Sequence, residues 1–281
     1  RQYADTIGVL VGAPEINPVR EGKDFFNAAY FLYEKQIKGS IHKTCLPNYD
    51  VFDEYRYFEP AYDWKSFEFK GKKYTPQSYA QAIGLNMADY VSLTSFTNHS
   101  LYSKCQLAIP DNYNWGDSYN VELNDLMTTV EFALSKGYTL AWGADVSEKG
   151  FSFKNGIALV PEDPSSIQVV GKDNKNYSDA GADKNANAFL SPVKELTITE
   201  EIRQKGYDNK TTTDDHGMHI VGLYTDQNGS KYLLVKNSWG ASNYPKGYLY
   251  VSEQYFRYKT INIYLHKDGI PAELKQKINL N

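Results

Sequence analysis

Hydrophobic and polar residues alternate in the last third of the chain and predict four successive strands. The four runs are MHIVGLYTD, KYLLVKNSW, GYLYVSE and TINIYLHK. A period of two is typical of strands with one buried face, and the DQNG sequence between the first two runs favours a hairpin. Because side chains alternate along a strand, Met218 and Ile220 share the face of His216, whereas His219 points the other way.

The middle of the chain repeats its apolar residues every three to four positions, which predicts helices. NVELNDLMTTVEFALSKG has this spacing and stops at Gly137, so it predicts an amphipathic helix with a glycine stop. The residues of its apolar face are Leu123, Leu126, Met127, Val130 and Leu134. YTLAWGAD then predicts a buried strand. Upstream, a Lys-Gly turn separates two short strand-like runs, and Thr75 followed by Pro76 predicts another helix start.

The first 60 residues are less regular. GKDFFNAAYFLYEKQ predicts a helix from the spacing of its apolar residues, while the rest of residues 1–60 is aromatic-rich and turn-prone and predicts no ordered series of elements. Residues 171–188 are polar and rich in Gly, Asn and Asp, which predicts a surface loop. Helices early and antiparallel strands late predict an α+β fold, taken as one domain over residues 1–281.

Composition and charge exclude several classes of function. The chain has 281 residues with 41% apolar and 23% charged residues, which is ordinary for a globular protein. A net charge of -4 without a basic helical face gives no reason to expect nucleic acid. No apolar run approaches the ~20 residues that span a bilayer, and we expect no cofactor and no metal. Cys45 and Cys105 are too few for a disulfide framework or a structural zinc site, although one bridge between them stays open.

The chain begins with Arg, and no signal segment precedes it. This predicts a processed product, an expressed fragment or a chain whose first part lies elsewhere. The sequence does not decide the compartment, because a soluble cytoplasmic protein and a protein exported to the periplasm of a bacterium both fit.

His216 opens the first of the four strands and Asn237 closes the second. A hairpin with its turn at DQNG can fold these residues into contact, and Trp239 can then shield their hydrogen bond from water, which strengthens it. Each residue alone has a plainer structural explanation, since a strand His is usually structural and an Asn at a strand end usually forms a turn.

Three stretches carry a resemblance to a known family. DHGMHIVG, YLLVKNSWG and KGYLYVS resemble the His and Asn segments of papain-type cysteine peptidases, and within them the bleomycin hydrolase and aminopeptidase C group with its bacterial relatives. Four further stretches agree, namely LTSFTNHSLY, SYNVELNDLM, AWGADVSEKGFS and DGIPAELKQK. The resemblance covers roughly residues 60–281. It implies a papain-like α+β fold of which this chain covers the insertion and the C-terminal antiparallel β half carrying His and Asn.

The resemblance also implies a Cys–His–Asn site for peptide hydrolysis. His216 would take the proton of a cysteine, giving a thiolate–imidazolium pair that attacks a peptide carbonyl. Asn237 would hold the imidazole ring, as Asp does in serine enzymes, with Trp239 in support. Peptides would be the substrates, cleaved by amino- or endopeptidase action.

This sequence departs from the family at the cysteine. The family's nucleophile lies in a Gln-Gly…Gly-x-Cys-Trp segment that starts a long helix, and no such segment occurs here. Cys45, in HKTCLPNYD, has Pro two residues later, and Cys105, in YSKCQLAIPDN, lies in a predicted strand. We therefore expect the nucleophile on an upstream or separate N-terminal segment, which would act as a partner. Two alternatives stay open: an inactive papain-fold homologue that binds peptides or proteins, and a structural protein that keeps the fold.

Only INLN follows DGIPAELKQK, the segment that matches the start of the family's C-terminal arm. In the bleomycin hydrolase group this arm lies in the cleft of a hexamer and restricts cleavage to the N-terminus of the substrate. Four extended residues reach about 14 Å at most. A more open cleft, endopeptidase or oligopeptidase activity and a homo-oligomer smaller than a hexamer are therefore expected.

Overall fold

The computed structural model describes residues 7–48, 53–62, 67–69, 71–167 and 187–280. The chain divides into two compact units, Arg1–Asn86 and Met87–Asn281, where the sequence was taken as one domain. The predicted surface loop at residues 171–188 lies outside the described residues as far as residue 186. Its last two positions begin the short helix α4 (Asn187–Leu190).

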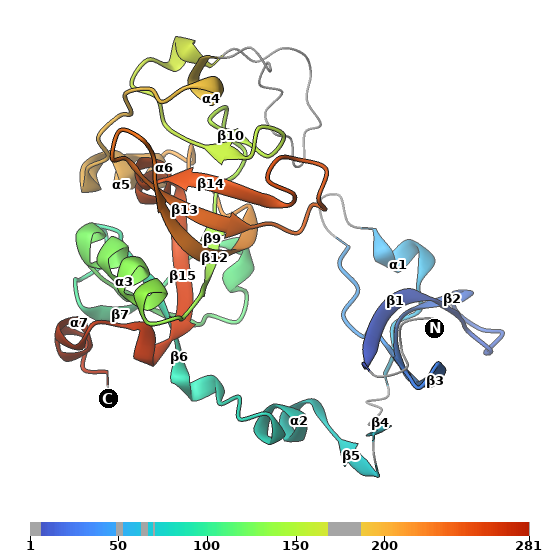
Figure 1. Ribbon diagram of the computed structural model, residues 1–281. Helices are drawn as coiled ribbons and strands as arrows, with labels where there is room; N and C mark the ends of the chain where they lie inside the picture. Colours follow the sequence, from blue (N-terminus) through green and yellow to red (C-terminus); the bar gives the residue numbers. More distant parts are fainter. Residues whose placement is uncertain (1–6, 49–52, 63–66, 70, 168–186, 281) are drawn as a thin grey trace. The chain divides into compact units, whose positions relative to one another are not determined.

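The first unit is built on a three-stranded antiparallel sheet in the order β1-β2-β3 (Figure 1). Its elements are β1 (Val9–Ile16), β2 (Phe25–Tyr33), β3 (Gln36–His42), α1 (Glu54–Tyr57), β4 (Phe67–Phe69), β5 (Lys72–Tyr74) and α2 (Pro76–Ala82). The β4–β5 pair and the start of α2 confirm the predicted turn and helix, because Gly71 has a φ of 71° and Thr75 accepts a hydrogen bond from the Ser78 amide.

The predicted helix at GKDFFNAAYFLYEKQ is wrong, because this segment forms β2. Every residue of β1 pairs with a residue of β2 from Val9 opposite Leu32 to Ile16 opposite Phe25. The run is rich in Phe and Tyr, which favour strands, and Glu34 and Lys35 both adopt positive φ, as a two-residue hairpin turn requires. Helical spacing in a short aromatic run was therefore a weaker signal than strand propensity and hairpin pairing.

The second unit contains a ten-stranded sheet in the order β10-β11-β14-β13-β12-β9-β15-β6-β8-β7. Its strands are β6 (Tyr90–Thr94), β7 (Ser103–Gln106), β8 (Asp117–Asn120), β9 (Leu140–Ala144), β10 (Phe151–Ser152), β11 (Ile157–Ala158), β12 (His216–Thr225), β13 (Lys231–Lys236), β14 (Tyr248–Ser252) and β15 (Thr260–His266). Its helices are α3 (Leu123–Ser135), α4, α5 (Glu200–Asp208), α6 (Glu253–Lys259), α7 (Ala272–Lys277) and the 3-10 turns η1 (Met87–Asp89), η2 (Pro110–Asn112), η3 (Pro164–Ser166) and η4 (Lys267–Gly269).

One face of this sheet packs on helices and forms the main core. The apolar stripe of α3 contacts the inward residues of the central strands, and Figure 1 shows α3 lying along the sheet. The four predicted late strands are β12, β13, β14 and β15, and β12 and β13 form the predicted hairpin. Met218 and Ile220 are buried and His219 is exposed, as the alternation predicted. The predicted strand after α3 is β9, and Cys105 lies on β7 as expected.

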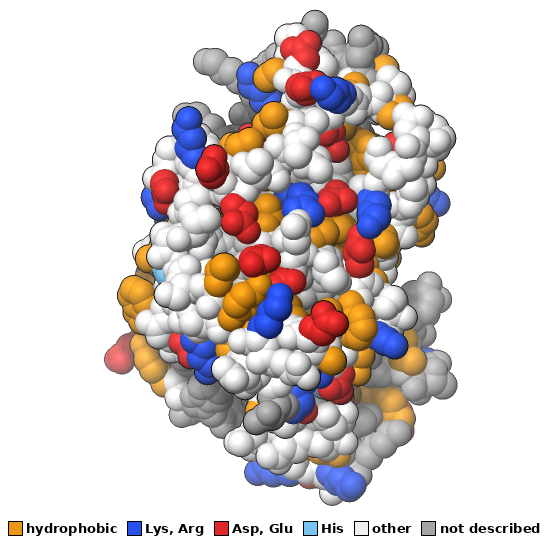
Figure 2. Space-filling view, turned by 90° about the vertical axis from the view of Figure 1, so that its left-hand side faces the viewer, with side chains coloured by type: hydrophobic (Ala, Val, Ile, Leu, Met, Phe, Trp, Pro, Cys, Tyr) orange, Lys and Arg blue, Asp and Glu red, His pale blue; other side chains and the backbone are white. Residues whose placement is uncertain are grey.

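The opposite face of the sheet carries the residues that point away from the core. Figure 2 shows the molecule from the side on which α3 and α7 lie in Figure 1, and acidic and basic side chains are interspersed there. Within the described part of the chain, no helix is long and apolar enough to cross a membrane. The same residues contain no group of three or more His, Cys, Asp or Glu side chains arranged to hold a metal ion.

Candidate active site

His216 and Asn237 lie in direct contact at one end of the β12–β13 hairpin. The Nε2 atom of His216 is 2.8 Å from the Oδ1 atom of Asn237. The same Oδ1 atom accepts a hydrogen bond from the backbone amide of Ser238 at 2.7 Å. Because a backbone N–H can only donate, the atom facing it is the carboxamide oxygen, so Nε2 of His216 carries the proton that it shares with Asn237.

Trp239 covers this pair. Its ring stacks on the imidazole of His216 with 5.0 Å between ring centroids. Phe151 and Phe153 meet Trp239 edge to face at 5.9 and 5.3 Å, which fixes the indole in place. The predicted contact between His216 and Asn237 and the predicted packing of Trp239 are therefore both present.

The hairpin sequence explains why these residues meet. Asp226 accepts hydrogen bonds from the amides of Asn228 and Ser230 with Oδ1, each at 2.8 Å, and Gly229 adopts a φ of 86°. This closes the tight turn between the two strands. Asn237 is only 8% exposed, and its backbone N–H donates to the carbonyl of Gly247 at 2.9 Å. The backbone of Asn237 is therefore fixed just beyond the end of β13.

A buried charge cluster lies directly behind the start of β12. Asp145 and Lys259 are 1% and 2% exposed, and Asp145 Oδ2 is 3.5 Å from the ammonium of Lys259. Lys259 also contacts Glu148. Asp215, the neighbour of His216, accepts hydrogen bonds from Thr213 Oγ1 at 2.7 Å and from two backbone amides.

Two carboxyl groups of this cluster, those of Asp145 and Asp215, have pKa values shifted in opposite directions. Burial, and then the hydrogen bond with Asp215, raises the pKa of Asp145 to about 6. Burial also acts to raise the pKa of Asp215, but hydrogen bonds from Asp145, Thr213 and Ser147 outweigh it and lower that pKa. The segment that precedes His216 is thus held by many hydrogen bonds and keeps one carboxylate ionised beside it.

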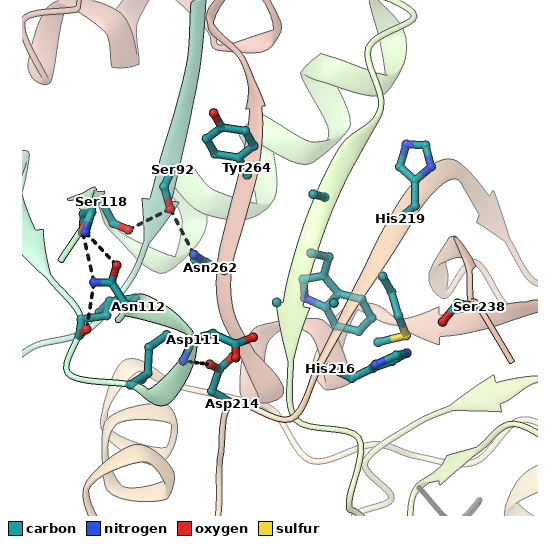
Figure 3. A pocket seen from close by; sticks show the side chains of 18 of the residues that line it. Ser92, Asp111, Asn112, Ser118, Asp214, His216, His219, Ser238, Asn262 and Tyr264 are labelled. Carbon is teal, nitrogen blue, oxygen red and sulfur yellow. Dashed lines mark hydrogen bonds between the residues drawn. The ribbon is translucent and has the colours of Figure 1, made fainter. Parts of the chain in front are cut away.

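His216 and Asn237 also line a cavity of about 870 Å³. Its lining includes three residues with little or no side chain, namely Ala141, Gly143 and Gly217, with Gly217 paired opposite Gly143. Figure 3 shows polar side chains along its far wall, where Ser92 bonds Ser118 at 2.8 Å and accepts from Asn262 at 3.2 Å.

Asp214 stands at the edge of this cavity next to Asp111 (Figure 3). Its carboxylate accepts the backbone amide of Asp111 at 3.3 Å. Burial, and after it the charge of Asp111, raises the pKa of Asp214 to about 6. The wall of the cavity therefore carries a carboxyl group, that of Asp214, which is harder to ionise than in water.

Neither cysteine has the setting of a nucleophile. Cys105 packs at the edge of a second apolar cluster and does not line the cavity. Burial and then the charge of Asp117 raise its pKa to about 11, whereas a reactive cysteine needs a lowered one. Cys45 is exposed in the loop between β3 and α1 and does not line the cavity.

The cluster behind His216 was missed by sequence reasoning. Lys259 follows Tyr258 in a polar helix and has the appearance of a surface lysine, and Asp145 follows a strand, where a turn is the usual explanation. The only signal was the pair of acidic residues Asp214 and Asp215 directly before His216, and this pair was not interpreted.

Comparison with known proteins shows similarity to a peptidase family over the last part of the chain. Residues 197–281 match the Peptidase C1-like family, and both His216 and Asn237 lie within the match. The structure of PepW from Lactobacillus rhamnosis superposes with a TM-score of 0.52 at 20% identity, covering 74% of this chain and 42% of that chain. The fold is papain-like. The predicted resemblance to papain-type peptidases is confirmed over residues 197–281, and the narrower assignment to the bleomycin hydrolase and aminopeptidase C group stays a prediction.

Two curated relatives match shorter stretches. Aminopeptidase W of Lactobacillus delbrueckii is 36% identical over 59 residues, which is 21% of this chain and 14% of that protein. Glutamine-dependent NAD(+) synthetase of Synechocystis sp. is 42% identical over 71 residues, which is 24% of this chain and 13% of that protein. The matched stretches thus span under a sixth of the length of either relative.

Proposed function

We propose that this chain supplies the histidine and asparagine of a Cys–His–Asn site in a cysteine peptidase. The observation that carries the proposal is the His216–Asn237 hydrogen bond under Trp239, within the segment that matches the Peptidase C1-like family. The plainer explanations, a structural His and a turn-forming Asn, do not account for an aromatic cover and a large cavity at the same pair.

The hydrogen-bond arrangement supports a base role for His216. With the proton on Nε2 held by Asn237, the lone pair of the neutral imidazole is on Nδ1. Nδ1 can accept a proton from a thiol and later return it to the leaving amine, which is general base and then general acid catalysis. Asn237 acts as a positioning residue, because it fixes the ring and the tautomer.

We infer that the nucleophile lies on a segment outside these 281 residues. Cys105 has a raised pKa and Cys45 lies in an exposed loop of the first unit. Asn237 supports this inference, because its Nδ2 atom is buried and has no hydrogen-bond partner among the described residues. An added segment could supply an acceptor there, and Gly217, which has open space where a Cβ would lie, would let it approach the sheet closely.

The substrate is proposed to be a peptide, with the similarity to aminopeptidase W favouring cleavage near a free N-terminus. A tail that occupied the cavity would favour the same restriction. However, Ile278 and Leu280 pack on the main core, and neither lines the cavity. Endopeptidase action therefore stays an equal proposal, as does a homo-oligomer of undefined size.

Hydrolysis of fluorogenic peptides by the protein expressed from its complete coding sequence tests this proposal. Activity should require a thiol reductant and fall by at least about 100-fold in His216→Ala, since general base catalysis contributes on this order. His219→Ala is the matched control, because His219 lies on the same strand and lines the same cavity, but its ring contacts Thr139 and not Asn237. No activity in the wild type would favour the inactive peptide-binding homologue, and equal losses in both variants would contradict the assignment of His216.

The match to glutamine-dependent NAD(+) synthetase favours a second candidate function, which is the release of ammonia from glutamine. It ranks second, because the aligned stretch covers 13% of that protein, while the peptidase-family match contains the His216–Asn237 pair. Release of ammonia from glutamine by the purified protein tests it. Release above that of a heat-denatured sample would support this candidate, and release at background would dismiss it.

A further inference from the structure

A second cavity lies toward the other end of β12. It has a volume of about 310 Å³, a size typical of small-ligand sites. Tyr224, which lines it, is eight positions after His216 on the same strand, so the two residues are about 27 Å apart along it. The cavity is thus separate from the His216–Asn237 site.

Three tyrosines form one side of this cavity. Tyr224 and Tyr232 are directly paired across the β12–β13 hairpin, and Tyr224 meets Tyr250 edge to face at 5.6 Å. In such a pair the positive edge of one ring meets the negative face of the other. The other side is apolar and comes from β11 and the segment around α4, with Ile157, Leu159, Phe189, Pro192 and Val193.

Two carboxylates complete the lining, which contains no Lys, Arg or His among its described residues. Glu195 accepts the Val160 amide at 2.6 Å and the Ser252 hydroxyl at 2.7 Å through Oε1. Asp226 uses Oδ1 in the hairpin turn, while its Oδ2 atom is buried and has no hydrogen-bond partner among the described residues. Burial, and then the charges of Glu195 and Asp226, raises the pKa of Tyr232 to about 12. Both carboxylates therefore act on the same hydroxyl group, that of Tyr232.

We propose that this cavity binds a lysine or arginine side chain presented by a polypeptide. The aliphatic stem of such a side chain would pack on the apolar wall, as long basic side chains do when only their charge needs polar partners. The cationic end would lie between the carboxylates of Glu195 and Asp226 and against a tyrosine ring face. An anionic ligand would be repelled, and a neutral apolar ligand would leave Asp226 Oδ2 unpaired. The proposal does not depend on peptidase activity.

An NMR titration of the full protein with each of three capped peptides tests the proposal. The peptides are Ala-Lys-Ala, Ala-norleucine-Ala and Ala-Glu-Ala, which share one backbone and differ in the central charge. The lysine peptide should bind saturably and at least about tenfold more tightly than the norleucine peptide. The glutamate peptide should not bind. Shifted signals should come from Tyr224, Tyr232 and Tyr250.

Two conservative variants then locate the charge. Glu195→Gln and Asp226→Asn should each weaken binding of the lysine peptide several-fold, while Glu273→Gln, the same change at an exposed position on α7, should leave it unchanged. Tyr224→Ala, at a side chain that is 50% exposed, removes a ring without threatening the fold and should also weaken binding. Equal binding of the lysine and norleucine peptides, equal effects of all three charge variants, or shifts confined to residues near His216 would each overturn the proposal.

Discussion

The charge cluster behind His216 makes a specific prediction about stability. Lys259 is 2% exposed and faces Asp145, which is 1% exposed, so neither charge has access to water. Lys259→Met keeps the length of the side chain and removes its charge. Removing one partner of a buried ion pair costs about 3–5 kcal/mol, because the other charge stays buried and uncompensated. We expect this loss in the free energy of unfolding at pH 7.

The loss should depend on pH with a definite sign. The pKa of Asp145 in the folded protein is about 6, above its ordinary value of 3.8. The folded state therefore binds this proton more tightly than the unfolded state, and the associated stability is lost as pH rises from about 4 through 6. Without Lys259 the carboxyl must stay protonated at pH 7, which is costly, whereas at pH 5 it is largely protonated already. At pH 5 the decrease in the free energy of unfolding caused by Lys259→Met should be below about half of its value at pH 7.

Urea unfolding followed by tryptophan fluorescence measures this effect. Trp142 is fully buried and its Nε1 donates to Thr260 Oγ1 at 2.8 Å, one residue from Lys259, so it reports on this region. Lys194→Met is the matched control, because Lys194 is 79% exposed and its pair with Glu162 should contribute below about 1 kcal/mol. Equal losses in the two variants, or a larger loss for Lys259→Met at pH 5 than at pH 7, would refute the reasoning.

Three further predictions concern single residues. Iodoacetamide at pH 8 should alkylate Cys45 before Cys105, because Cys45 is exposed and burial raises the pKa of Cys105 to about 11; unfolding in urea should abolish the difference. Trp239→Ala should lower peptidase activity more than Trp239→Phe, because only the latter keeps a ring over His216; equal activities would count against the shielding role. Asp214→Asn should stabilise the protein more at pH 7 than at pH 4, because burial raises the pKa of Asp214 to about 6 and the folded state disfavours its ionised form; no pH dependence in urea unfolding would argue against it.

The sequence was sufficient to predict elements whose pattern repeats over several periods. The α3 helix keeps its apolar spacing over 13 residues. The β12–β13 hairpin combines alternation with a turn sequence. In both elements the local preference agrees with the tertiary structure. The His216–Asn237 contact followed from the same hairpin. The β2 strand was missed because a nine-residue aromatic run satisfies helical spacing by coincidence.

The remaining features depend on contacts that no local pattern records. Asp145 and Lys259 are 114 positions apart, and Thr211 and Thr212 join them from a third segment. A charged residue usually lies on the surface, so burial of this cluster could be seen only after the strands were placed. The division into two units likewise follows from contacts and not from composition, which changes little between them.

Mapping the thiol whose alkylation stops peptide hydrolysis tests the central claim most directly. The protein is expressed from its complete coding sequence, inactivated with iodoacetamide and analysed by peptide mass spectrometry. If His216 and Asn237 serve a nucleophile on another segment, the label that tracks inactivation should lie on a cysteine other than Cys45 and Cys105. It should also form much more slowly in His216→Ala, because His216 promotes the thiolate. Inactivation that tracks labelling of Cys45 or Cys105, or that proceeds at the same rate in His216→Ala, would contradict the account.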